Sequence, residues 1–277
     1  MRLSNTDIDH QKSRPSPKQP SITQTAIDHP NSHRSPRQPS ITQTAIDFRM
    51  QSPSTLAPDL HHGADVKHRF ITLEGIDGAG KSTHLETLAQ YLREQGESVL
   101  VSREPGGSEL AERIRDLLLH QEMGSLTELL LVFAARNDHL ERLIRPALAE
   151  GQWVICDRFT DASWAYQGAG RGMDAASIAW LEARVHSNFQ PLRTYWFDLD
   201  PLEAAKRRAI SRGAADRFEA EDLVFFQRVR EGYASRAALR GQAFLRIDAS
   251  QSKARIGEQI MIDLTSLRAG FAKTHPG

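Results

Sequence analysis

The sequence predicts an α/β protein in which a five-stranded parallel sheet carries helices on both faces, preceded by a tail that has no core of its own. Two observations lead to this prediction. From residue 68 onward, short apolar runs typical of buried strands alternate with long helical patterns. Before that point the chain is rich in proline and poor in aromatic residues. We therefore expect a single domain over residues 68–270 and a disordered tail over residues 1–67.

The tail differs from the rest of the chain in composition and also repeats itself. It holds eight of the thirteen prolines, and such a stretch buries too little surface to offset the entropy of ordering it. Ser16–Asp28 recurs as Ser35–Asp47 at an offset of nineteen residues. Two copies are too few for a stacked repeat fold. An array of partner-binding peptides is the alternative. Because Met50 follows the second copy, we also hypothesise that duplicated upstream DNA produced the tail and that the natural start is later.

Five apolar runs are the expected strands. They are Phe70–Glu74, Ser98–Ser102, Trp153–Cys156, Thr194–Leu199 and Ala243–Ile247. Between them, helical patterns run over Leu126–Glu150 and Leu223–Leu239. Gly96 is a plausible C-terminal cap of the first helix, because glycine adopts the left-handed conformation that ends many helices.

Composition excludes several classes of partner. The 35 basic residues balance the 35 acidic ones, so no net field attracts nucleic acid or a membrane surface. No window is long and apolar enough for a membrane span, and the N-terminus lacks the apolar core of a secretory signal. The single cysteine, Cys156, stands in an apolar run and cannot form an internal disulfide, so we interpret it as a buried structural thiol. These observations favour a cytoplasmic protein.

Residues 75–82 match the phosphate-loop pattern G-x-x-x-x-G-K-[ST], between a predicted strand and a periodic helix. Glycines allow consecutive backbone N–H groups to point at one anion, while Lys81 can reach the β and γ phosphates and the Ser82 hydroxyl can hold Mg²⁺. The alternative is a glycine-rich turn that matches by accident. We expect a nucleoside triphosphate to be bound by Gly75, Ile76, Asp77, Gly78, Ala79, Gly80, Lys81, Ser82 and Thr83.

Three further segments follow the second, third and fourth predicted strands, at the edge of a parallel sheet where ligands bind. They are Arg103-Glu-Pro-Gly-Gly107, Asp157-Arg158-Phe159 leading to Tyr166–Gly172, and Lys206–Arg208 running to Asp216–Glu219. Together with the phosphate loop, and in the same order and spacing, they make residues 69–265 resemble thymidylate kinase (dTMP kinase) of the bacterial type.

This resemblance implies the three-layer P-loop kinase fold and a Mg²⁺-assisted transfer of a phosphoryl group from ATP to dTMP, giving dTDP. It also implies a homodimer. Apolar stretches such as Leu126–Phe133 do not by themselves distinguish a dimer face from core. The expected partners are therefore small molecules and a second copy of the chain.

The resemblance also assigns roles close to the reacting phosphates. Asp77 stands where the family places a carboxylate near the 3′-hydroxyl of the acceptor sugar. Arg158 would bridge the acceptor phosphate and the transferred group, and Asp157 would help Ser82 to hold and orient Mg²⁺. For Asp157 and Arg158 the alternative is a surface ion pair at the end of a strand.

Glu104 and Pro105 resemble the family's turn that borders the monophosphate, and Arg115 matches an arginine that contacts the acceptor phosphate. On its own, Arg115 would be an ordinary solvated helix residue. The combination favours an acceptor that already carries a phosphate, because a kinase for nucleosides needs a base at this place rather than a cationic clamp. A kinase for a different monophosphate remains the nearest alternative.

Further positions match residues that the family uses to bind the acceptor nucleoside. Arg136 corresponds to an arginine that donates a hydrogen bond to the thymine carbonyl, and Ser163 and Gln167 to residues that contact the base. Tyr166 would lie under the sugar, where its ring would crowd a 2′-hydroxyl and so favour deoxyribose.

One position departs from the family's pattern. The family usually has an aromatic residue four positions before the base-reading arginine, where it stacks on thymine, and here that position is Val132. Phe133, three positions before, is on a nearby part of the helix and is our candidate for this contact. The alternative is that Phe133 belongs to the core.

The segment with Lys206, Arg207, Arg208, Arg212 and Arg217 resembles the family's lid, although a run of charge is usually a solvated helix. A bacterial-type lid brings an arginine to the phosphoryl group, and Arg212 and Arg217 are both candidates. We expect catalysis to depend on Lys81, Arg158, Asp77 and one of these two. A nucleotide-driven switch is the rival from another class, but the sequence shows no clear water-positioning residue or partner surface for it.

Overall fold

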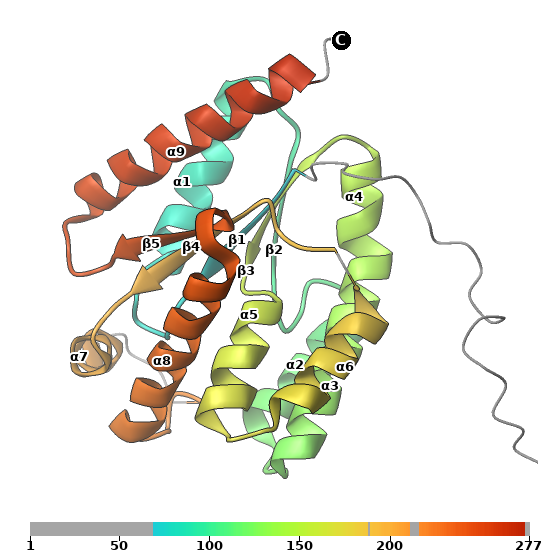
Figure 1. Cartoon of the computed structure of the whole chain (residues 1–277), viewed down its shortest axis with the longest axis vertical. Helices are drawn as coiled ribbons and strands as arrows, with labels where there is room; N and C mark the ends of the chain where they lie inside the picture. The colour runs from blue at the N-terminus through green and yellow to red at the C-terminus, as the bar shows by residue number, and fades with distance from the viewer. Residues whose placement is uncertain (1–68, 188, 211–215, 275–277) are drawn as a thin grey trace, which may run out of the picture. The chain divides into compact units, whose positions relative to one another are not determined.

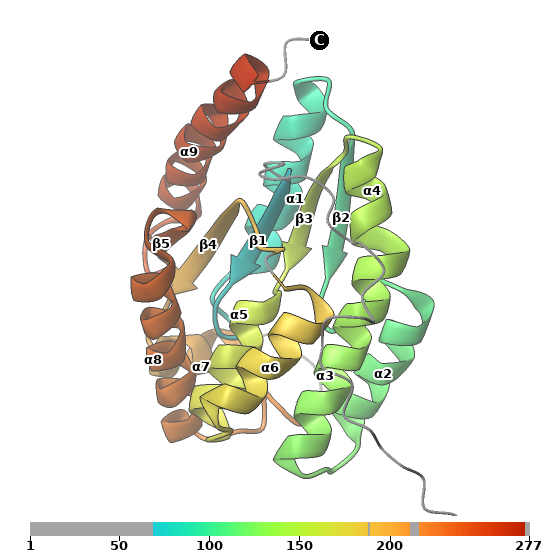
Figure 2. The ribbon, with the colours of Figure 1, turned by 45° about the vertical axis from the view of Figure 1, so that its right-hand side comes forward.

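All five strands are parallel and form one sheet in the order β2-β3-β1-β4-β5, shown in Figures 1 and 2. They span Phe70–Glu74 (β1), Val99–Arg103 (β2), Trp153–Asp157 (β3), Arg193–Asp198 (β4) and Phe244–Asp248 (β5). The predicted fold class is confirmed, and no strand boundary differs from the prediction by more than one residue. The computed structural model describes residues 69–187, 189–210 and 216–274. The tail predicted over residues 1–67 lies outside these residues and stays a prediction.

The topology places a crevice at the carboxyl end of β1. The chain passes from β3 on one side of β1 to β4 on the other, so the loops after these strands diverge around β1. Ligands of parallel sheets bind at such a point, because the diverging loops leave room between them.

The helices are α1 (Lys81–Glu94), α2 (Glu109–His120), α3 (Ser125–His139), η1 (Leu140–Ile144), α4 (Arg145–Ala149), α5 (Thr160–Ser163), η2 (Trp164–Gly170), α6 (Ala175–Val185), α7 (Pro201–Ile210), α8 (Leu223–Arg240), η3 (Gly241–Ala243) and α9 (Lys253–Thr274). In Figures 1 and 2, α1 and α9 lie side by side on one face of the sheet, and α5 and α8 lie on the other. The sheet is therefore the middle of three layers.

Strand β4 illustrates why the strands read as continuous apolar runs. The ring of Trp196 is stacked on Tyr233 of α8 with their centroids 6.3 Å apart, whereas the next residue, Phe197, has its ring 5.5 Å from that of His84 of α1. Successive side chains of a strand point to opposite faces. Because both faces of this sheet are covered, both sets of side chains have to be apolar.

The helical pattern predicted over Leu126–Glu150 is present but contains a π-helical turn. Helix α3 continues through η1 into α4 without leaving the helical region. Pro146, at the start of α4, has no N–H to donate and its ring excludes the usual carbonyl four residues earlier, so the preceding turn widens. Gly96 ends α1 as predicted, with a φ of 80° and its N–H donating to Arg93 O at 2.9 Å.

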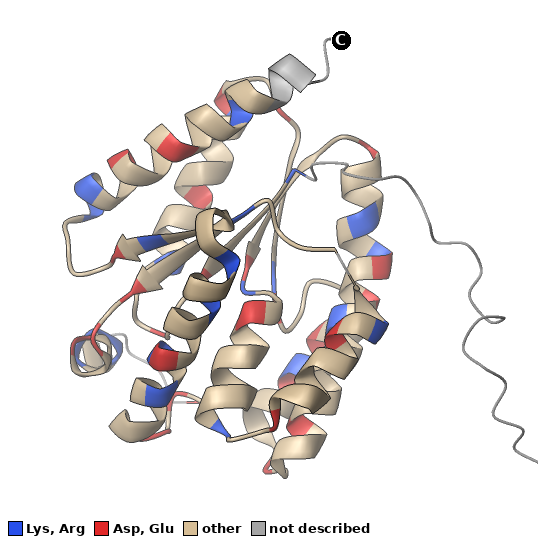
Figure 3. Ribbon diagram, viewed as in Figure 1, with Lys and Arg blue, Asp and Glu red and all other residues tan. Residues whose placement is uncertain are grey.

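Burial agrees with the expectation for the single cysteine. Cys156 is fully buried and free, which confirms the structural thiol, and burial raises the pKa of that thiol well above its usual range. Acidic and basic residues are interspersed along α9, as Figure 3 shows. Within the described ranges, every helix is too short or too polar to cross a membrane.

Candidate active site

The loop between β1 and α1 is shaped by three glycines with positive φ. Gly75, Gly78 and Gly80 have φ angles of 135°, 87° and 94°. A Cβ at Gly75 would come within 2.5 Å of the carbonyl oxygen of Phe197, and one at Gly78 within 2.6 Å of that of Ala204. These two glycines therefore let the loop pack against β4 and α7. A Cβ at Gly80 would meet nothing within 4 Å, so at Gly80 the backbone faces open space that an anion can enter.

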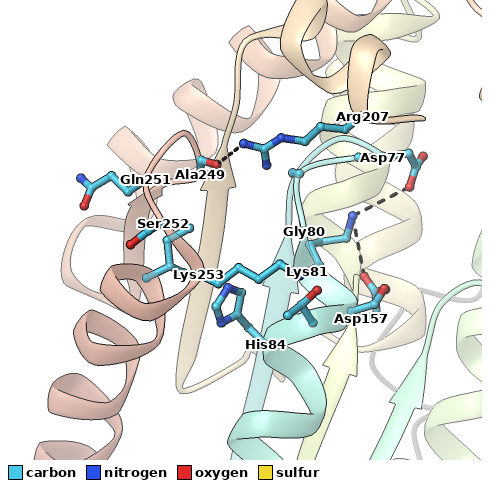
Figure 4. Close-up of a pocket in the computed structure, with 15 residues that line it drawn as sticks. Asp77, Gly80, Lys81, His84, Asp157, Arg207, Ala249, Gln251, Ser252 and Lys253 are labelled. Atoms are coloured by element: carbon cyan, nitrogen blue, oxygen red, sulfur yellow. Dashed lines mark hydrogen bonds and ion pairs between the residues drawn. The ribbon is translucent and has the colours of Figure 1, made fainter. Parts of the chain in front are cut away.

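Lys81 begins α1 and lies over the loop rather than in solvent. Its side chain is only 5% exposed, and Nζ donates to the carbonyl oxygen of Gly75 at 3.0 Å. Nζ also lies 3.8 Å from Asp77 Oδ1 and 4.0 Å from Asp157 Oδ1, as the dashed lines in Figure 4 show. Burial, followed by the positive charge of Arg158, lowers the pKa of Lys81. The ammonium group is thus held where phosphates of a ligand on the loop would lie.

We call the cavity above this loop the loop pocket; it measures about 610 Å³. Its floor is the predicted nucleotide-binding stretch, except that Gly75 and Ile76 lie beneath the surface. Its far wall comes from α7 and the turn after β5, including Arg207, whose Nη2 donates to Ala249 O at 3.0 Å (Figure 4). The lining residues are Asp77, Gly78, Ala79, Gly80, Lys81, Ser82, Thr83, His84, Asp157, Arg207, Ala249, Gln251, Ser252, Lys253 and Ile256.

The residues predicted to hold Mg²⁺, Ser82 and Asp157, both line the loop pocket. Asp157 Oδ1 is buried and accepts no hydrogen bond from the described residues; its nearest cation is Lys81 Nζ at 4.0 Å. A buried carboxylate oxygen that accepts no hydrogen bond is unfavourable, and the water molecules of a hydrated cation would donate hydrogen bonds to it. In the part of the chain that the structure describes, no three acidic, His or Cys side chains gather to hold a metal alone. A cation beside Ser82 would take most of its ligands from phosphates and water, which is typical of Mg²⁺.

A second, smaller cavity of about 180 Å³ lies on the other side of Asp77, and we call it the arginine pocket. It contains every residue predicted to bind the acceptor except Phe133. Asp77 lines both cavities, so the two meet at its carboxylate. The lining residues are Asp77, Glu104, Pro105, Arg115, Leu119, Val132, Arg136, Arg158, Phe159, Ala162, Ser163, Tyr166, Gln167, Asp216, Phe218 and Glu219.

Asp77 and Arg158 form an ion pair where the two cavities meet. Arg158 Nη2 donates to Asp77 Oδ1 at 2.7 Å and to the hydroxyl oxygen of Tyr166 at 3.1 Å. Burial alone would raise the pKa of Asp77, but Arg158 and then Lys81 outweigh it and hold that pKa well below its ordinary value. Asp77 is therefore a carboxylate at neutral pH, which balances part of the positive charge gathered around it.

Arg158 adopts a conformation that few residues other than glycine adopt. Its φ is 71°, and the N–H groups on either side of this bend are both bonded: Arg158 N to Leu73 O at 2.9 Å and Phe159 N to Glu74 Oε1 at 2.7 Å. Tyr233 links the side chains, because it accepts from Arg158 Nη1 at 3.0 Å and donates to Glu74 Oε2 at 2.8 Å. Burial raises the pKa of Glu74 to about 8. These contacts hold a strained backbone that aims Arg158 at the boundary of the two pockets.

Arg136 is the most deeply buried arginine of the arginine pocket, at 1% exposed. Its Nε donates to Glu104 Oε2 at 2.7 Å, Nη1 to Ser163 Oγ at 3.0 Å and Nη2 to the Phe159 carbonyl at 3.1 Å. The other oxygen of Glu104 accepts from His139 Nδ1 at 3.1 Å. Burial opposes ionisation of Glu104, yet Arg136 and this hydrogen bond from His139 lower its pKa. The guanidinium is thus fixed in orientation before any ligand arrives.

Comparisons with known proteins show which family has this sequence and fold. A sequence model described as thymidylate kinase matches residues 73–260, more than half of the chain. The chain belongs to the thymidylate kinase family. It is 55% identical over 195 residues to a thymidylate kinase of Alcanivorax borkumensis, with 69% of this chain and 93% of the relative covered. It is 53% identical over 200 residues to one of Paracidovorax citrulli, with 69% and 90% covered.

A solved structure of thymidylate kinase from Ehrlichia chaffeensis is similar to the described fold. The TM-score is 0.57 at 35% sequence identity, and the match covers 70% of this chain and 97% of that chain. Membership of the thymidylate kinase family is therefore supported by sequence and by architecture.

One predicted contact of the thymidylate kinase pattern does not fit the structure. Phe133 is 1% exposed and packs with Leu129 and Ile178, away from the arginine pocket. Val132 lines the pocket instead, because neighbouring residues of an α-helix point about 100° apart. The ring of Phe133 lies 4.7 Å from the guanidinium carbon of Arg136. Phe133 is therefore placed to support the arginine from behind and not to stack on a base in this pocket.

The two lid candidates of the thymidylate kinase pattern have different outcomes. Arg212 lies outside the described residues. Arg217 lines neither pocket: its Nε donates to Leu118 O at 3.0 Å and its Nη1 lies 2.7 Å from Glu128 Oε2. This anchoring favours Arg212 over Arg217 as the arginine that reaches the phosphates, and that choice stays a prediction.

Several residues of the thymidylate kinase site were missed from sequence. Glu74 and Glu128 each stand as a single acid in an otherwise apolar stretch, Phe-Ile-Thr-Leu-Glu and Leu-Thr-Glu-Leu-Leu, and that conflict is a usable signal. Tyr233 gave no signal because it comes from a distant helix. The turn at Ala249–Ser252 could have been found from its position after the carboxyl end of the last strand.

Proposed function

We propose that this chain transfers the γ-phosphoryl group of ATP to dTMP, giving ADP and dTDP. The observation that carries the proposal is the meeting of two anion-binding cavities at Asp77, with Lys81 on one side and Arg158 on the other. The loop pocket has the backbone and size that suit a triphosphate nucleotide. The arginine pocket presents guanidinium groups to an anionic acceptor. Ligands in the two pockets would meet through their phosphate ends.

The reaction is a direct displacement. An oxygen of the dTMP phosphate forms a bond to the γ-phosphorus, the bond to the bridging oxygen breaks, and ADP leaves with that electron pair. The acceptor phosphate is already anionic at neutral pH, so no side chain has to remove a proton and no covalent enzyme intermediate is needed. The contribution of the chain is alignment and positive charge. We assign Lys81 to the β and γ phosphates and Arg158 to the space between acceptor and transferred group.

Four further residues complete the phosphate site in this proposal. Ser82 would be a direct ligand of Mg²⁺ and Asp157 would orient its waters; Mg²⁺ bound there neutralises charge on the β and γ phosphates. Arg115, whose Nη1 donates to Pro105 O at 2.9 Å, would contact the acceptor phosphate. Arg212 would add charge from the lid.

The acceptor nucleoside is recognised by side chains that are already fixed. A guanidinium has five N–H groups, and Arg136 uses three of them on Glu104, Ser163 and the Phe159 carbonyl. The other two are available for a thymine carbonyl. Tyr166, with its hydroxyl held by Arg158, would lie under the sugar and leave no room for a 2′-hydroxyl.

We also propose that the chain works as a homodimer in the cytoplasm. Helices α2, α3 and α6 pack side by side and expose large apolar residues that the core does not use. The sequence alone did not assign the apolar stretch Leu126–Phe133 to a dimer face or to the core. In the structure it contributes to both the surface and the core, since Leu126 and Leu130 are exposed whereas Leu129 is buried. The exposed set is Leu110, Leu117, Leu126, Leu130 and Trp180. Light scattering that gives a monomer mass for the purified chain would contradict the dimer.

The test of the function is an assay that couples ADP formation to a colour change, run with a panel of acceptors. We expect ATP turnover with dTMP and very little without an acceptor or with thymidine. A nucleotide-driven switch would consume ATP without dTMP, and a kinase for nucleosides would prefer thymidine. Either result would overturn the proposal.

A further inference from the structure

Glu128 of α3 is a fully buried carboxylate that lines neither pocket. Its Oε1 accepts from Gln167 Nε2 at 2.8 Å. Its Oε2 lies 2.7 Å from Arg217 Nη1 and 3.3 Å from Arg171 Nε. A buried charge persists only when it is paired and hydrogen-bonded, and here each oxygen has a partner.

These contacts determine which way the amide of Gln167 points. Glu128 forms ion pairs with the guanidinium groups of Arg171 and Arg217, and the carboxylate of an ion pair only accepts hydrogen bonds. Gln167 must therefore turn its NH₂ group toward Glu128. Its carbonyl oxygen, on the opposite branch of the amide, is directed away from Glu128.

Gln167 lines the arginine pocket, 3% exposed, and among the described residues no donor reaches its Oε1. Arg136, with two N–H groups left, lines the same cavity. The pocket thus presents a donor and an acceptor together. Thymine offers the complement on one edge, a carbonyl acceptor at C4 beside the N3–H donor. Cytosine offers the reverse, an amino donor at C4 beside an N3 acceptor.

We propose that Glu128 is a positioning residue for base selection, which it performs by holding Gln167 so that Oε1 accepts the N3–H of a thymine or uracil base. This inference rests on the proposed function. It deepens that function by explaining how Glu128, which does not contact the acceptor, determines whether the pocket prefers thymine or cytosine. Without the carboxylate, the amide of Gln167 can turn over and present a donor to cytosine.

The test compares kcat/KM for dTMP, dUMP and dCMP at saturating ATP, in the wild type and in Glu128→Gln. We expect the dTMP/dCMP ratio to fall by about tenfold or more, the size of one misdirected buried hydrogen bond. The dTMP/dUMP ratio should stay within about twofold, because uracil carries the same edge and lacks only the methyl group. If dCMP turns over too slowly, dissociation constants from calorimetry are compared instead, and the ratio of the dCMP and dTMP constants should shift in the same direction.

Arg171→Gln is the matched control, since it removes a partner of Glu128 but leaves the contact with Gln167 in place. We expect its dTMP/dCMP ratio to remain close to that of the wild type. If Glu128→Gln lowers kcat/KM for all three acceptors equally, or if Arg171→Gln changes the base ratio as much, Glu128 is only structural and the proposal is overturned.

If Glu128→Gln does not fold, Glu128→Asp carries the test, because it keeps the charge for the arginines but is one methylene too short for Gln167. A several-fold lower dTMP/dCMP ratio supports the proposal, and a wild-type ratio overturns it. A wild type that does not phosphorylate dTMP at all would instead overturn the proposed function, so the two failures are distinguishable.

Discussion

On the floor of the loop pocket the groups that suit an anion are backbone N–H groups and Lys81, all from a single continuous stretch, Asp77–Thr83, while Arg207 and Lys253 line the far wall. In the arginine pocket they are side chains from α2, α3, the end of β3 and η2. The first arrangement depends on glycine conformations that any similar loop can adopt. The second depends on buried partners that orient each guanidinium. The contrast teaches that binding of a phosphate chain can be local, whereas selection of an acceptor requires the whole fold.

The largest effect expected is on turnover through the loop pocket. Lys81→Ala should lower kcat by about 10²-fold or more while the fold survives, because the transition state loses a positioned charge in a water-poor site. Steady-state kcat, with the melting temperature as a check on folding, measures it. Arg93→Ala, at the other end of α1 and 42% exposed, should stay within about twofold. Near-normal turnover of Lys81→Ala would contradict the assignment.

In the arginine pocket we expect the loss of a partner to affect both stability and binding. Glu104→Gln leaves Arg136 buried without a counter-charge, which costs about 3–5 kcal/mol in similar cases. The KM for dTMP should rise and that for ATP should not. The matched variant is Glu112→Gln, whose partner Arg103 is 55% exposed, and its cost should remain under about 1 kcal/mol. Urea unfolding measures the loss of stability in both variants. Equal losses would contradict the expectation that the buried ion pair matters more than the exposed one.

Glu74, behind the boundary of the two pockets, should make stability depend on pH. Burial raises its pKa to about 8 from an ordinary value of about 4.5, so between these values the folded chain binds a proton that the unfolded chain has lost. Stability should therefore fall as pH rises through this window, by on the order of 2 kcal/mol between pH 5 and 7. Glu74→Gln keeps the shape of the neutral acid and should remove this part of the slope. Parallel stability curves for the two proteins would show that Glu74 does not titrate there.

The smallest effect is expected at Gly80, where a substitution can be tested for two separate consequences, strain in the backbone and lost contact with the nucleotide. Gly80→Ala places a methyl group at a φ of 94° and should cost about 1–2 kcal/mol. Gly96→Ala, at a φ of 80° and also without neighbours within 4 Å, should cost a similar amount. Only Gly80→Ala should raise the KM for ATP, because only that methyl group enters the loop pocket. A raised KM in both variants would trace the effect to stability alone.

The difference between the pockets also explains what could be predicted from sequence. The strands and the loop pocket's floor follow from local patterns, since apolar runs and glycine spacing act over a few residues. Phe133 was misjudged because one residue of helix rotation decides between pocket and core, and α6 determines that rotation by packing Ile178 against it. Tyr233 acts through Glu74, which is 159 positions away in the sequence, and Glu128 acts through Gln167, which is 39 positions away. No local pattern encodes such contacts.

The separation of the two cavities is incomplete at residue 77. Its side chain belongs to the acceptor's surroundings, while its backbone belongs to a loop whose course is fixed by neighbouring glycines. Evolution toward a new acceptor could exchange Val132, which lines the arginine pocket alone, but at residue 77 any replacement must also suit the donor. We therefore expect lineages that change acceptor to do so around Asp77 rather than through it.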